Sequence, residues 1–345
     1  VTSDNDDGAP SSVVVNQLHS IKDISDRRGG SVYIGRSSLL TMTNSTTKDA
    51  TGAGAIYVSS AKVVLSQVLV LDSTCPIDSA AIMCVSSNLK VNENSVVSGT
   101  TGRGLKGIGC ALQVENVHFL KNTVVSSKAS DTDINGGGIS LVSESELTVA
   151  FSTFESNTAD GDGGGIMCNE CIKIDITNST FLGNVAGRGG GLSIYKTPAN
   201  GILSSTTFTQ NSAKKGGGGA IYRVGQVALV PSDTITFDRN VALYGNDTAT
   251  DPFKAIVYRH SSEDITNFEE IGNPSIFLSV LDRYNAIVKE SAVSTVVTPS
   301  SENATAPLFN NEPKIINVKT GTAEFNNLKL FAQPGGYNIT FAAVV

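Results

Sequence analysis

The sequence contains no tryptophan, and it has few aromatic and few charged residues. Among its 345 residues, aromatic side chains account for 6% and charged side chains for 17%. Val, Ile, Thr, Ser and the 34 glycines are abundant instead. This composition is unlike that of a helical domain and predicts an all-β, turn-rich fold. With 40% hydrophobic residues, a chain of this length can bury the cores of two domains.

Extended basic runs and extended apolar runs are also missing. The net charge is −7, and the longest basic runs are the pairs Arg27-Arg28 and Lys214-Lys215. We therefore expect no nucleic-acid partner. No stretch of 18 apolar residues occurs, so we also expect no membrane insertion. The chain begins at Val1 without a signal peptide, as either a processed secreted protein or a fragment would.

The five cysteines do not form a zinc-binding pattern. The only close pair is Cys168 and Cys171, with no histidine beside it. This pair stands inside a glycine-rich β repeat, whereas a thioredoxin-like motif follows a strand and opens a helix. A structural disulfide in an oxidising compartment is therefore favoured over a redox motif.

Internal repetition is the main signal in the first two-thirds of the chain. A small-residue cluster, in most copies glycine-rich, is followed by an aliphatic marker residue in eight places. These places are residues 29–32, 52–56, 80–82, 107–108, 136–139, 163–166, 189–192 and 216–221. The fourth marker is Ile108, with Leu105 as the alternative. A period of this size, filled with short alternating runs and turn residues, predicts a solenoid of β-strands.

A second motif runs in phase with the first. It places a Phe three residues before an Asn, and a small apolar residue follows the Asn by two. The Phe positions are Phe119, Phe154, Phe181, Phe208 and Phe237, and the Asn positions are Asn122, Asn157, Asn184, Asn211 and Asn240. The first three coils lack the motif and have residues such as Val70 and Ser73 in its place.

Together the two motifs predict a right-handed parallel β-helix of about eight coils over residues 29–250. Strands of successive coils stack about 4.8 Å apart, so like residues lie above like. We expect the Phe residues to form an internal stack, and the Asn residues to form a structural ladder at one turn. A ligand site at the Asn residues is the less favoured alternative.

These glycine-cluster and Phe-x-x-Asn motifs resemble the repeats of the chlamydial polymorphic membrane proteins, over about residues 29–245. They also resemble β-helical repeats in large surface proteins of algae and other protists. The bacterial proteins are adhesins, so the resemblance implies the fold and suggests a role at a surface.

Residues 251–345 lack the glycine clusters and contain longer alternating strands, which suit a β-sandwich. Residues 278–288 and 321–341 resemble bacterial-type and filamin-type immunoglobulin-like repeats, in which Tyr337 would be a packing tyrosine. We expect this sandwich to cap one open end of the β-helix. Residues 1–28, a leader and a cap strand, would cover the other end.

Candidate catalytic groups are few. The acidic pairs are Asp131 with Asp133 and Asp160 with Asp162, in turns where solvated Asp is expected. The three histidines, His19, His118 and His260, stand apart from one another and from these pairs. The acidic residues 4–8 resemble half of a calcium loop but lack its closing Glu. We therefore predict no catalytic residue, no cofactor and no metal site.

Two kinds of covalent feature are predicted. Cys84 and Cys110 each stand two residues after a marker, Ile82 and Ile108, and would form a disulfide between adjacent coils. Cys168 and Cys171 would form the second disulfide, which leaves Cys75 unpaired. N-glycosylation sequons begin at Asn44, Asn178, Asn246, Asn303 and Asn338.

The favoured function is that of a secreted, non-enzymatic structural protein, the repeating subunit of a fibre, coat or cell-surface appendage. The alternative is a monomeric adhesin or carbohydrate-binding module, and a polysaccharide lyase or hydrolase is more distant. The apolar runs at residues 11–18 and 337–345 would pair with neighbouring copies head to tail, or the second run would pair within its own sheet.

Overall fold

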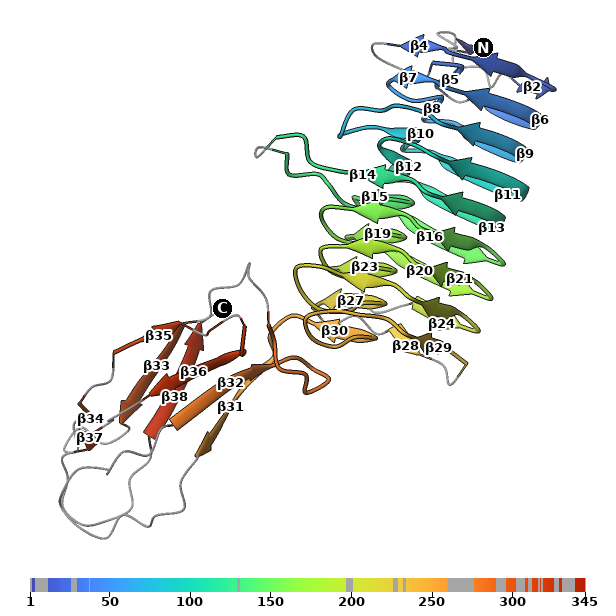
Figure 1. Ribbon diagram of the computed structural model, residues 1–345. Helices are drawn as coiled ribbons and strands as arrows, with labels where there is room; N and C mark the ends of the chain where they lie inside the picture. The colour runs from blue at the N-terminus through green and yellow to red at the C-terminus, as the bar shows by residue number, and fades with distance from the viewer. Residues whose placement is uncertain are drawn as a thin grey trace.

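The computed structural model describes residues 2–3, 12–25, 30–36, 38–128, 131–196, 201–225, 229–231, 234–259, 276–289, 296–301, 308–309, 312–315, 317, 319–325, 329–330 and 339–344. In these residues the regular elements are all β-strands. Up to residue 250 they stack as successive parallel coils, and antiparallel sheets follow (Figure 1). The predicted parallel β-helix is thereby confirmed.

Sheet A is a single unbranched row of strands that runs along the whole β-helix. It contains β1 (Thr2–Ser3), β5 (Val32–Ile34), β8 (Ile56–Ser59), β10 (Ala80–Val85), β12 (Arg103–Ile108), β15 (Ile139–Val142), β19 (Ile166–Asn169), β23 (Leu192–Tyr195), β27 (Ile221–Val224) and β30 (Thr248–Thr250). The glycine-cluster motifs lead into these strands, so the marker residues form one inward column of sheet A, in which the fourth coil contributes Leu105 and not Ile108.

Sheet B contributes a strand after each strand of sheet A except β30. Its main path contains β2 (Ser12–Asn16), β6 (Leu39–Lys48), β9 (Lys62–Leu71), β11 (Asn88–Ser98), β13 (Ala111–Leu120), β16 (Glu146–Ala150), β20 (Lys173–Thr177), β24 (Gly201–Ser204) and β28 (Leu229–Pro231). The nine strands of this path correspond to about eight turns of the helix.

Each coil crosses sheet B in two successive segments, which we call its first and second arms. The second arm carries the Phe residues. In the early coils, β6, β9, β11 and β13 run through both arms as single long strands. In the later coils the second arm is a separate strand, namely β17 (Thr153–Glu155), β21 (Thr180–Leu182), β25 (Thr207–Thr209) and β29 (Thr236–Asp238), and β3 (His19–Ile21) precedes them at the other end.

The third side of each coil is short. Its strands are β14 (Thr123–Val124), β18 (Thr158–Ala159), β22 (Val185–Ala186) and β26 (Ser212–Ala213), with β4 (Ile24–Ser25) and β7 (Thr51–Gly52) paired at the first coils. Each strand directly follows the Asn position, and therefore every coil turns sharply at that residue.

Alternation decides which side chains enter the β-helix. In β16, for example, Leu147 and Val149 are fully buried, whereas their neighbours are more exposed. Single inward columns stack through all coils into one continuous apolar core. Glycine is required where coils approach closely, because a Cβ at Gly165 would lie 2.6 Å from the Gly191 carbonyl oxygen.

The C-terminal region is built of antiparallel strands. One sheet contains β31 (Lys254–Arg259), β32 (Ile276–Leu281) and β36 (Thr322–Phe325), and another contains β35 (Lys314–Ile315), β33 (Val296–Ser301) and β38 (Ile339–Val344). A further pair joins β34 (Leu308–Phe309) to β37 (Lys329–Leu330). The apolar run near the C-terminus thus pairs with β33 of its own chain. Tyr337 lies outside the described residues.

This region contacts the β-helix at its last coils. One buried cluster joins Tyr222, Tyr244 and Ala249 to Leu278, Val280, Val288, Ala323 and Phe325. Tyr222 and Ala249 are paired outward positions of sheet A. Among the described residues, none beyond Phe237 belongs to the β-helix core. The expectation that this region caps the open end is therefore wrong for the described contacts, because it packs against the side of sheet A.

A buried carboxylate fixes this joint. Asp282 accepts hydrogen bonds from the backbone nitrogens of Thr250, Tyr284 and Ala286 at 2.8–3.1 Å. Removal of this carboxyl from water raises its pKa above the ordinary value for Asp. The last strand of sheet A is thus bonded directly to the turn that follows β32.

Candidate ligand-binding site on the outer face of sheet A

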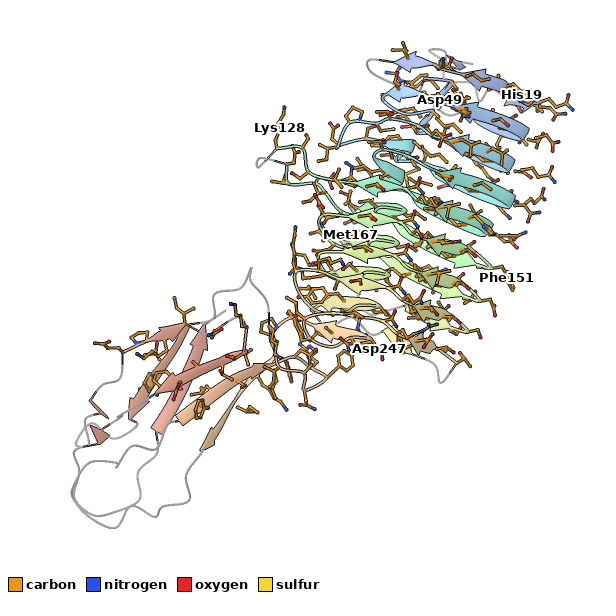
Figure 2. All side chains as sticks on the ribbon, viewed as in Figure 1. His19, Asp49, Lys128, Phe151, Met167 and Asp247 are labelled. Atoms are coloured by element: carbon orange, nitrogen blue, oxygen red, sulfur yellow. A yellow bond between two sulfur atoms is a disulfide. The ribbon has the colours of Figure 1, made fainter. Side chains whose placement is uncertain are left out.

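The longest turn of the β-helix precedes β15. The register pairs Leu105 with Ile139, 34 positions apart, whereas Ile139 and Ile166 are only 27 apart. The additional residues project from the solenoid around Lys128 (Figure 2). Asp131 holds the turn, because its carboxylate accepts hydrogen bonds from the backbone nitrogens of Lys128 and Ser127. These bonds lower the pKa of Asp131.

Arg103 anchors the base of this turn. Its side chain is fully buried, and its guanidinium donates to the carbonyl oxygens of Ile77, Ser79, Asp133 and Asn135. It also forms an ion pair with the Asp133 carboxylate at 2.6 Å. Burial lowers the pKa of Arg103, yet a guanidinium stays protonated because its ordinary pKa is so high.

Lys106 lies beside this ion pair on the outer face of β12. Its ammonium is 2.7 Å from the other oxygen of Asp133 and donates to the carbonyl oxygen of Asp78 at 2.9 Å. Only 9% of the Lys106 side chain is exposed, compared with 40% of the Asp133 side chain. One carboxylate therefore bridges two buried cations and still reaches solvent.

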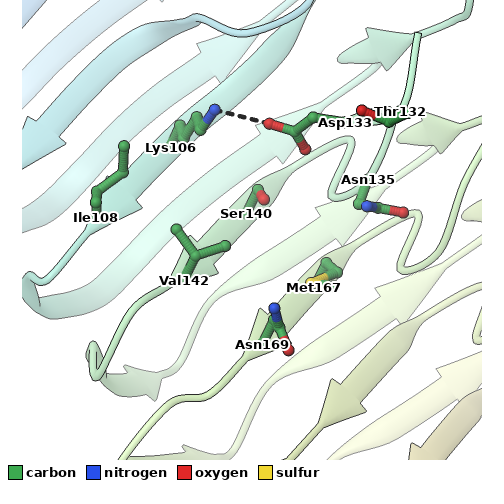
Figure 3. A pocket seen from close by; sticks show the side chains of 9 residues that line it. All are labelled: Lys106, Ile108, Thr132, Asp133, Asn135, Ser140, Val142, Met167 and Asn169. Atoms are coloured by element: carbon green, nitrogen blue, oxygen red, sulfur yellow. Dashed lines mark hydrogen bonds and ion pairs between the residues drawn. The ribbon is translucent and has the colours of Figure 1, made fainter. Parts of the chain in front are cut away.

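A pocket of about 220 Å³ opens next to the Asp133 carboxylate (Figure 3). The long turn supplies one wall, and outward side chains of β12, β15 and β19 supply the floor. The lining residues are Lys106, Ile108, Thr132, Asp133, Asn135, Ser140, Val142, Met167 and Asn169. The surface combines an ion pair, amides and hydroxyls with an aliphatic patch.

A second polar cluster follows further along sheet A. Arg188 binds both carboxylate oxygens of Asp162, at 3.0 and 2.8 Å, and the Tyr195 hydroxyl donates to the same carboxylate at 2.6 Å. The Arg188 guanidinium also lies 5.1 Å from the ring centroid of Tyr222. Burial raises the pKa of Tyr195, so this hydroxyl remains a hydrogen-bond donor.

The acidic pairs differ from their sequence-based interpretation. Asp162 is nearly buried, Asp133 is partly exposed, and both carboxylates form ion pairs with buried or half-buried cations instead of being free in solvent. Asp160 accepts a hydrogen bond from the backbone of Ser126, which ties the long turn to the next coil. His19 and His118 are exposed on the outer face of sheet B, and His260 lies outside the described residues, as do residues 4–8.

The ladder residues occupy the interior. The rings of Phe119, Phe154, Phe181, Phe208 and Phe237 are stacked with centroids 4.6–5.7 Å apart. The side-chain oxygen of Asn184 accepts from both the backbone and side-chain nitrogens of Asn157, and its own amide nitrogen donates to the Phe154 carbonyl. The same pattern joins Asn122, Asn157, Asn184, Asn211 and Asn240. These amides are internal and bonded, so they offer nothing to a ligand.

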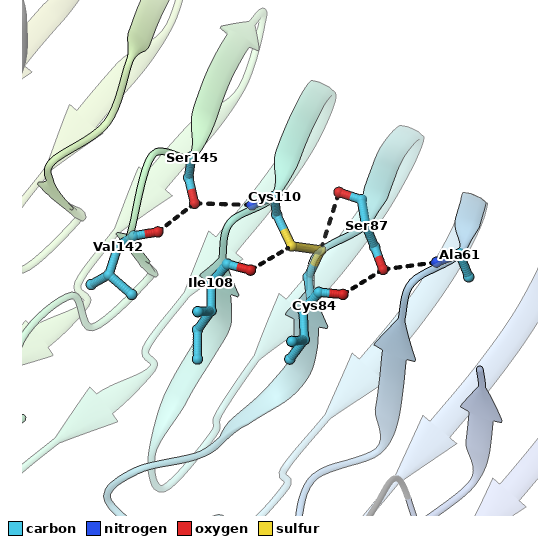
Figure 4. The surroundings of a disulfide bond; sticks show 8 residues. Ala61, Cys84, Ser87, Ile108, Cys110, Val142 and Ser145 are labelled. Carbon is cyan, nitrogen blue, oxygen red and sulfur yellow. Dashed lines mark hydrogen bonds between the residues drawn. A yellow bond between two sulfur atoms is a disulfide. The ribbon is translucent and has the colours of Figure 1, made fainter. Parts of the chain in front are cut away.

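The structure contains disulfides between Cys84 and Cys110 and between Cys168 and Cys171. The register argument for the first was wrong, because Leu105, not Ile108, pairs with Ile82, and Cys84 faces Gly107. Cys110 instead lies in the turn after β12, with its Cα 6.4 Å from that of Cys84 (Figure 4). Cys75 is free and buried, and burial raises its thiol pKa to about 12.

Three of the five sequons fall on described residues. Asn44, Asn178 and Asn246 are exposed. Asn44 and Asn178 occupy the same corner between the arms of sheet B, in the left-handed conformation with φ of 46° and 47°. Phe151 is at this corner too, and it is 60% exposed (Figure 2). Asn303 and Asn338 lie outside the described residues.

Sequence reasoning missed Arg103 and Lys106. A signal was present, since two cations flank Gly104 and Leu105 where the paired strands of other coils have uncharged residues. Among the described residues, no group of three or more His, Cys, Asp or Glu side chains could hold a metal ion. No helical segment in that part of the chain has the length and hydropathy of a membrane span.

Two family descriptions match the chain. A right-handed β-helix region matches residues 9–154, which fits the parallel coils seen here. The repeat of the Chlamydia polymorphic membrane protein matches residues 151–169 and 205–222. Both of these shorter segments carry the Phe-x-x-Asn motif and a glycine cluster. Searches of curated proteins and of solved structures gave no significant match. The matched segments are therefore similar to right-handed β-helix regions and to the repeats of a bacterial membrane protein.

Proposed function

We propose that this chain is a non-enzymatic structural module of an extracellular surface, and that copies of it join head to tail. The observation that carries the proposal is that inward residues at both ends of the β-helix are only partly buried. Inward residues of the middle coils, such as Phe181, are fully buried. Inward residues of the first coil, Val13 and Val15, and of the last, Ile235 and Phe237, are only partly buried against the same core.

The strand edges at these ends support the same proposal. Among the described strands, β2 stands at one edge of sheet B and β28 at the other, and β29 ends the second arm. All pairings within the β-helix are parallel, so the end of one copy has the strand direction that the start of another requires. An unprotected edge of this kind invites pairing with a further chain. Such a head-to-tail contact does not close and so builds a filament.

The carboxylates support a non-enzymatic role. Asp133 lines the pocket on sheet A, the Asp162 backbone bonds to the lining residue Asn135, and both carboxylates are held by cations. Hydrolysis of glycosides requires two carboxyl groups at a fixed separation that exchange protons with the substrate and water, whereas each of these carboxylates is engaged by a cation. The similarity to polymorphic membrane protein repeats supports a surface location, and the two disulfides support an oxidising compartment.

We also propose an immunoglobulin-like sandwich for residues 251–345. The support is the antiparallel pairing of β31, β32 and β36 and of β33, β35 and β38. Packed on the side of the last coils, such a domain would leave the coil end accessible to another copy. N-glycans at the exposed Asn44, Asn178 and Asn246 would be compatible with this arrangement, since all three lie on outer surfaces.

The assembly is tested by placing a charge at either end. Val15→Lys puts a cation on the inward side of the first coil, and Ile235→Lys does so at the last coil. Each variant should stay monomeric by light scattering under conditions in which the unaltered chain forms filaments. An equimolar mixture of the two should give a discrete dimer, because each variant retains one functional end.

Matched controls exist in the same strands. Val14 is 73% exposed and Thr236 faces outward, so Val14→Lys and Thr236→Lys should leave polymerisation unchanged. Circular dichroism would show that all four variants remain folded. Filaments formed by both end variants, or an unaltered chain that stays monomeric at high concentration, would refute the head-to-tail proposal.

A monomeric adhesin is the second candidate. The pocket on the outer face of sheet A favours it, because a solenoid that serves only as a spacer does not require a mixed polar and aliphatic cavity. The two candidates differ in the state of the native material, which is a filament for the first and an isolated rod for the second.

A further inference from the structure

We propose that the pocket on the outer face of sheet A binds a neutral sugar residue of a glycan. The proposal rests on the chemistry of the lining and not on polymerisation, so it stands whether or not copies of the chain assemble. Asp133 would accept hydrogen bonds from sugar hydroxyls, with Lys106 beside it and Asn169 across the pocket as donors.

The polar groups of the pocket retain capacity for a ligand. Each Asp133 carboxylate oxygen holds one cation, and an ionised carboxylate has about four lone-pair sites. Lys106 has three ammonium hydrogens, of which two point to Asp78 and Asp133. The buried ion pairs fix both side chains before a ligand arrives, so little rotamer entropy is lost on binding.

Amide groups complete the polar part of the lining. Asn135 uses its side-chain oxygen to accept from the Asp162 backbone at 2.8 Å, and this bond fixes the orientation of the amide. Asn169 lies at the end of β19 on the opposite side of the pocket (Figure 3). A carboxylate and amides placed around one cavity present acceptors and donors together, as neighbouring hydroxyls require.

The floor of the pocket is aliphatic. Ile108, Val142 and Met167 belong to three successive strands and face outward from sheet A. The carbon-bound hydrogens of a pyranose ring form an apolar face that can lie on such a surface. The pocket volume of about 220 Å³ is below the roughly 300–1,000 Å³ that is typical for drug-sized ligands. One sugar ring fits this description better than a longer segment.

The charge distribution favours a neutral sugar over an acidic one. Both cations are already bound to Asp133, and Asp78 adds a further negative charge near Arg103. An anionic sugar would face the exposed part of the Asp133 carboxylate and would compete with it for Lys106. A neutral ring avoids this repulsion and can donate to the carboxylate instead.

The intact chain can be tested by saturation-transfer NMR with methyl glycosides of glucose, galactose, mannose and N-acetylglucosamine, and with methyl glucuronide as the anionic probe. At least one neutral glycoside should bind with a millimolar Kd, and more tightly than the glucuronide. Tighter binding of the glucuronide would overturn the proposal. So would the absence of binding by every neutral glycoside at a millimolar concentration that is 20-fold above that of the protein.

Variants identify the site. Asn169→Ala should weaken binding at least fivefold, and Met167→Trp should abolish it by filling the pocket. Asn88→Ala makes the same change at an exposed position of sheet B and should leave binding unchanged. Thermal melting would show that each variant folds. If both Asn169→Ala and Met167→Trp bind like the unaltered chain, the sugar is held elsewhere and the assignment is wrong.

Discussion

The early and the late coils of the β-helix share one cross-section but fill it with different side chains. In β6, β9 and β11, a single strand runs through both arms of sheet B, and the inward column of the second arm holds Thr47, Val70 and Val97 in turn. From β13 onward, a stacked Phe fills the same column, since Val97 pairs with Phe119 and Phe119 with Phe154. The column therefore accepts side chains of different size and polarity, and the fold does not depend on one residue type.

The turn that follows this column in each coil also differs between the early and the late coils. The late coils place Asn there, and each amide from Asn122 to Asn211 is bonded to the Asn of the next coil. The early coils place Ser73 and Thr100, whose buried hydroxyls have no hydrogen-bond partner in the protein. An unpaired buried hydroxyl is unfavourable, whereas the amide satisfies both coils at once. We infer that the late coils hold their turns more firmly than the early ones.

The largest expected effect is removal of a ring from the Phe stack. Phe181→Ala should lower the free energy of unfolding by about 3–5 kcal/mol, because it leaves a cavity between two stacked rings. Val70→Ala in the same column should lose less, since only two methyl groups are removed. Chemical denaturation measures both, and Phe151→Ala, at a 60% exposed Phe, is the control that should change little. Equal losses at Phe181 and Phe151 would contradict the internal stack.

The disulfides should differ between early and late coils. The bond from Cys84 to Cys110 closes a separation of 26 residues, and its loss should cost about 3–4 kcal/mol through the entropy of the unfolded chain. The bond from Cys168 to Cys171 closes only 3, so its loss should cost under about 2 kcal/mol. Melting curves of the two double Cys→Ala variants give the comparison. A reversed order would show that the chain-entropy argument does not apply.

Removal of one ladder amide should also destabilise the late coils. Asn184→Ala leaves the amide donors of Asn157 without their acceptor, at a cost of about 1–3 kcal/mol for the unsatisfied groups. Urea denaturation would measure the loss, and Asn88→Ala at an exposed position should be neutral. A neutral Asn184→Ala would mean that water replaces the amide without penalty.

The smallest expected effect is a gain in stability. Thr100→Asn should extend the ladder by one coil, because the backbone nitrogen of Thr100 already donates to the Asn122 side-chain oxygen at 3.3 Å. An amide there can donate to the same oxygen and replace the unpaired hydroxyl, for a gain of about 1 kcal/mol. Thr101→Asn, one residue further and exposed, is the control for the thermal melt. A loss of stability at position 100 would show that the early coils are too narrow for the amide.

Much of the β-helix could be predicted because its signal repeats. Phe154, Phe181 and Phe208 recur at nearly constant spacing, and a parallel coil places such residues in one column. The prediction failed at Ile108, where Leu105 is the true marker, since both follow a glycine and only the pairing of whole strands distinguishes them. The side-on packing of Tyr222 against the C-terminal sheet was equally invisible, because it joins residues without a shared period.

By itself, the sequence determined the coil, its period and the identity of its internal columns, because stacking at a fixed rise converts a repeat into a contact. Only the tertiary structure decided what lies outside the coil. Arg103 and Asp133 are 30 positions apart and follow no repeat, yet the long turn brings them together as a buried ion pair beside an open pocket. Burial and charge pairing at that distance depend on the path of one non-repeating turn, which periodicity does not encode.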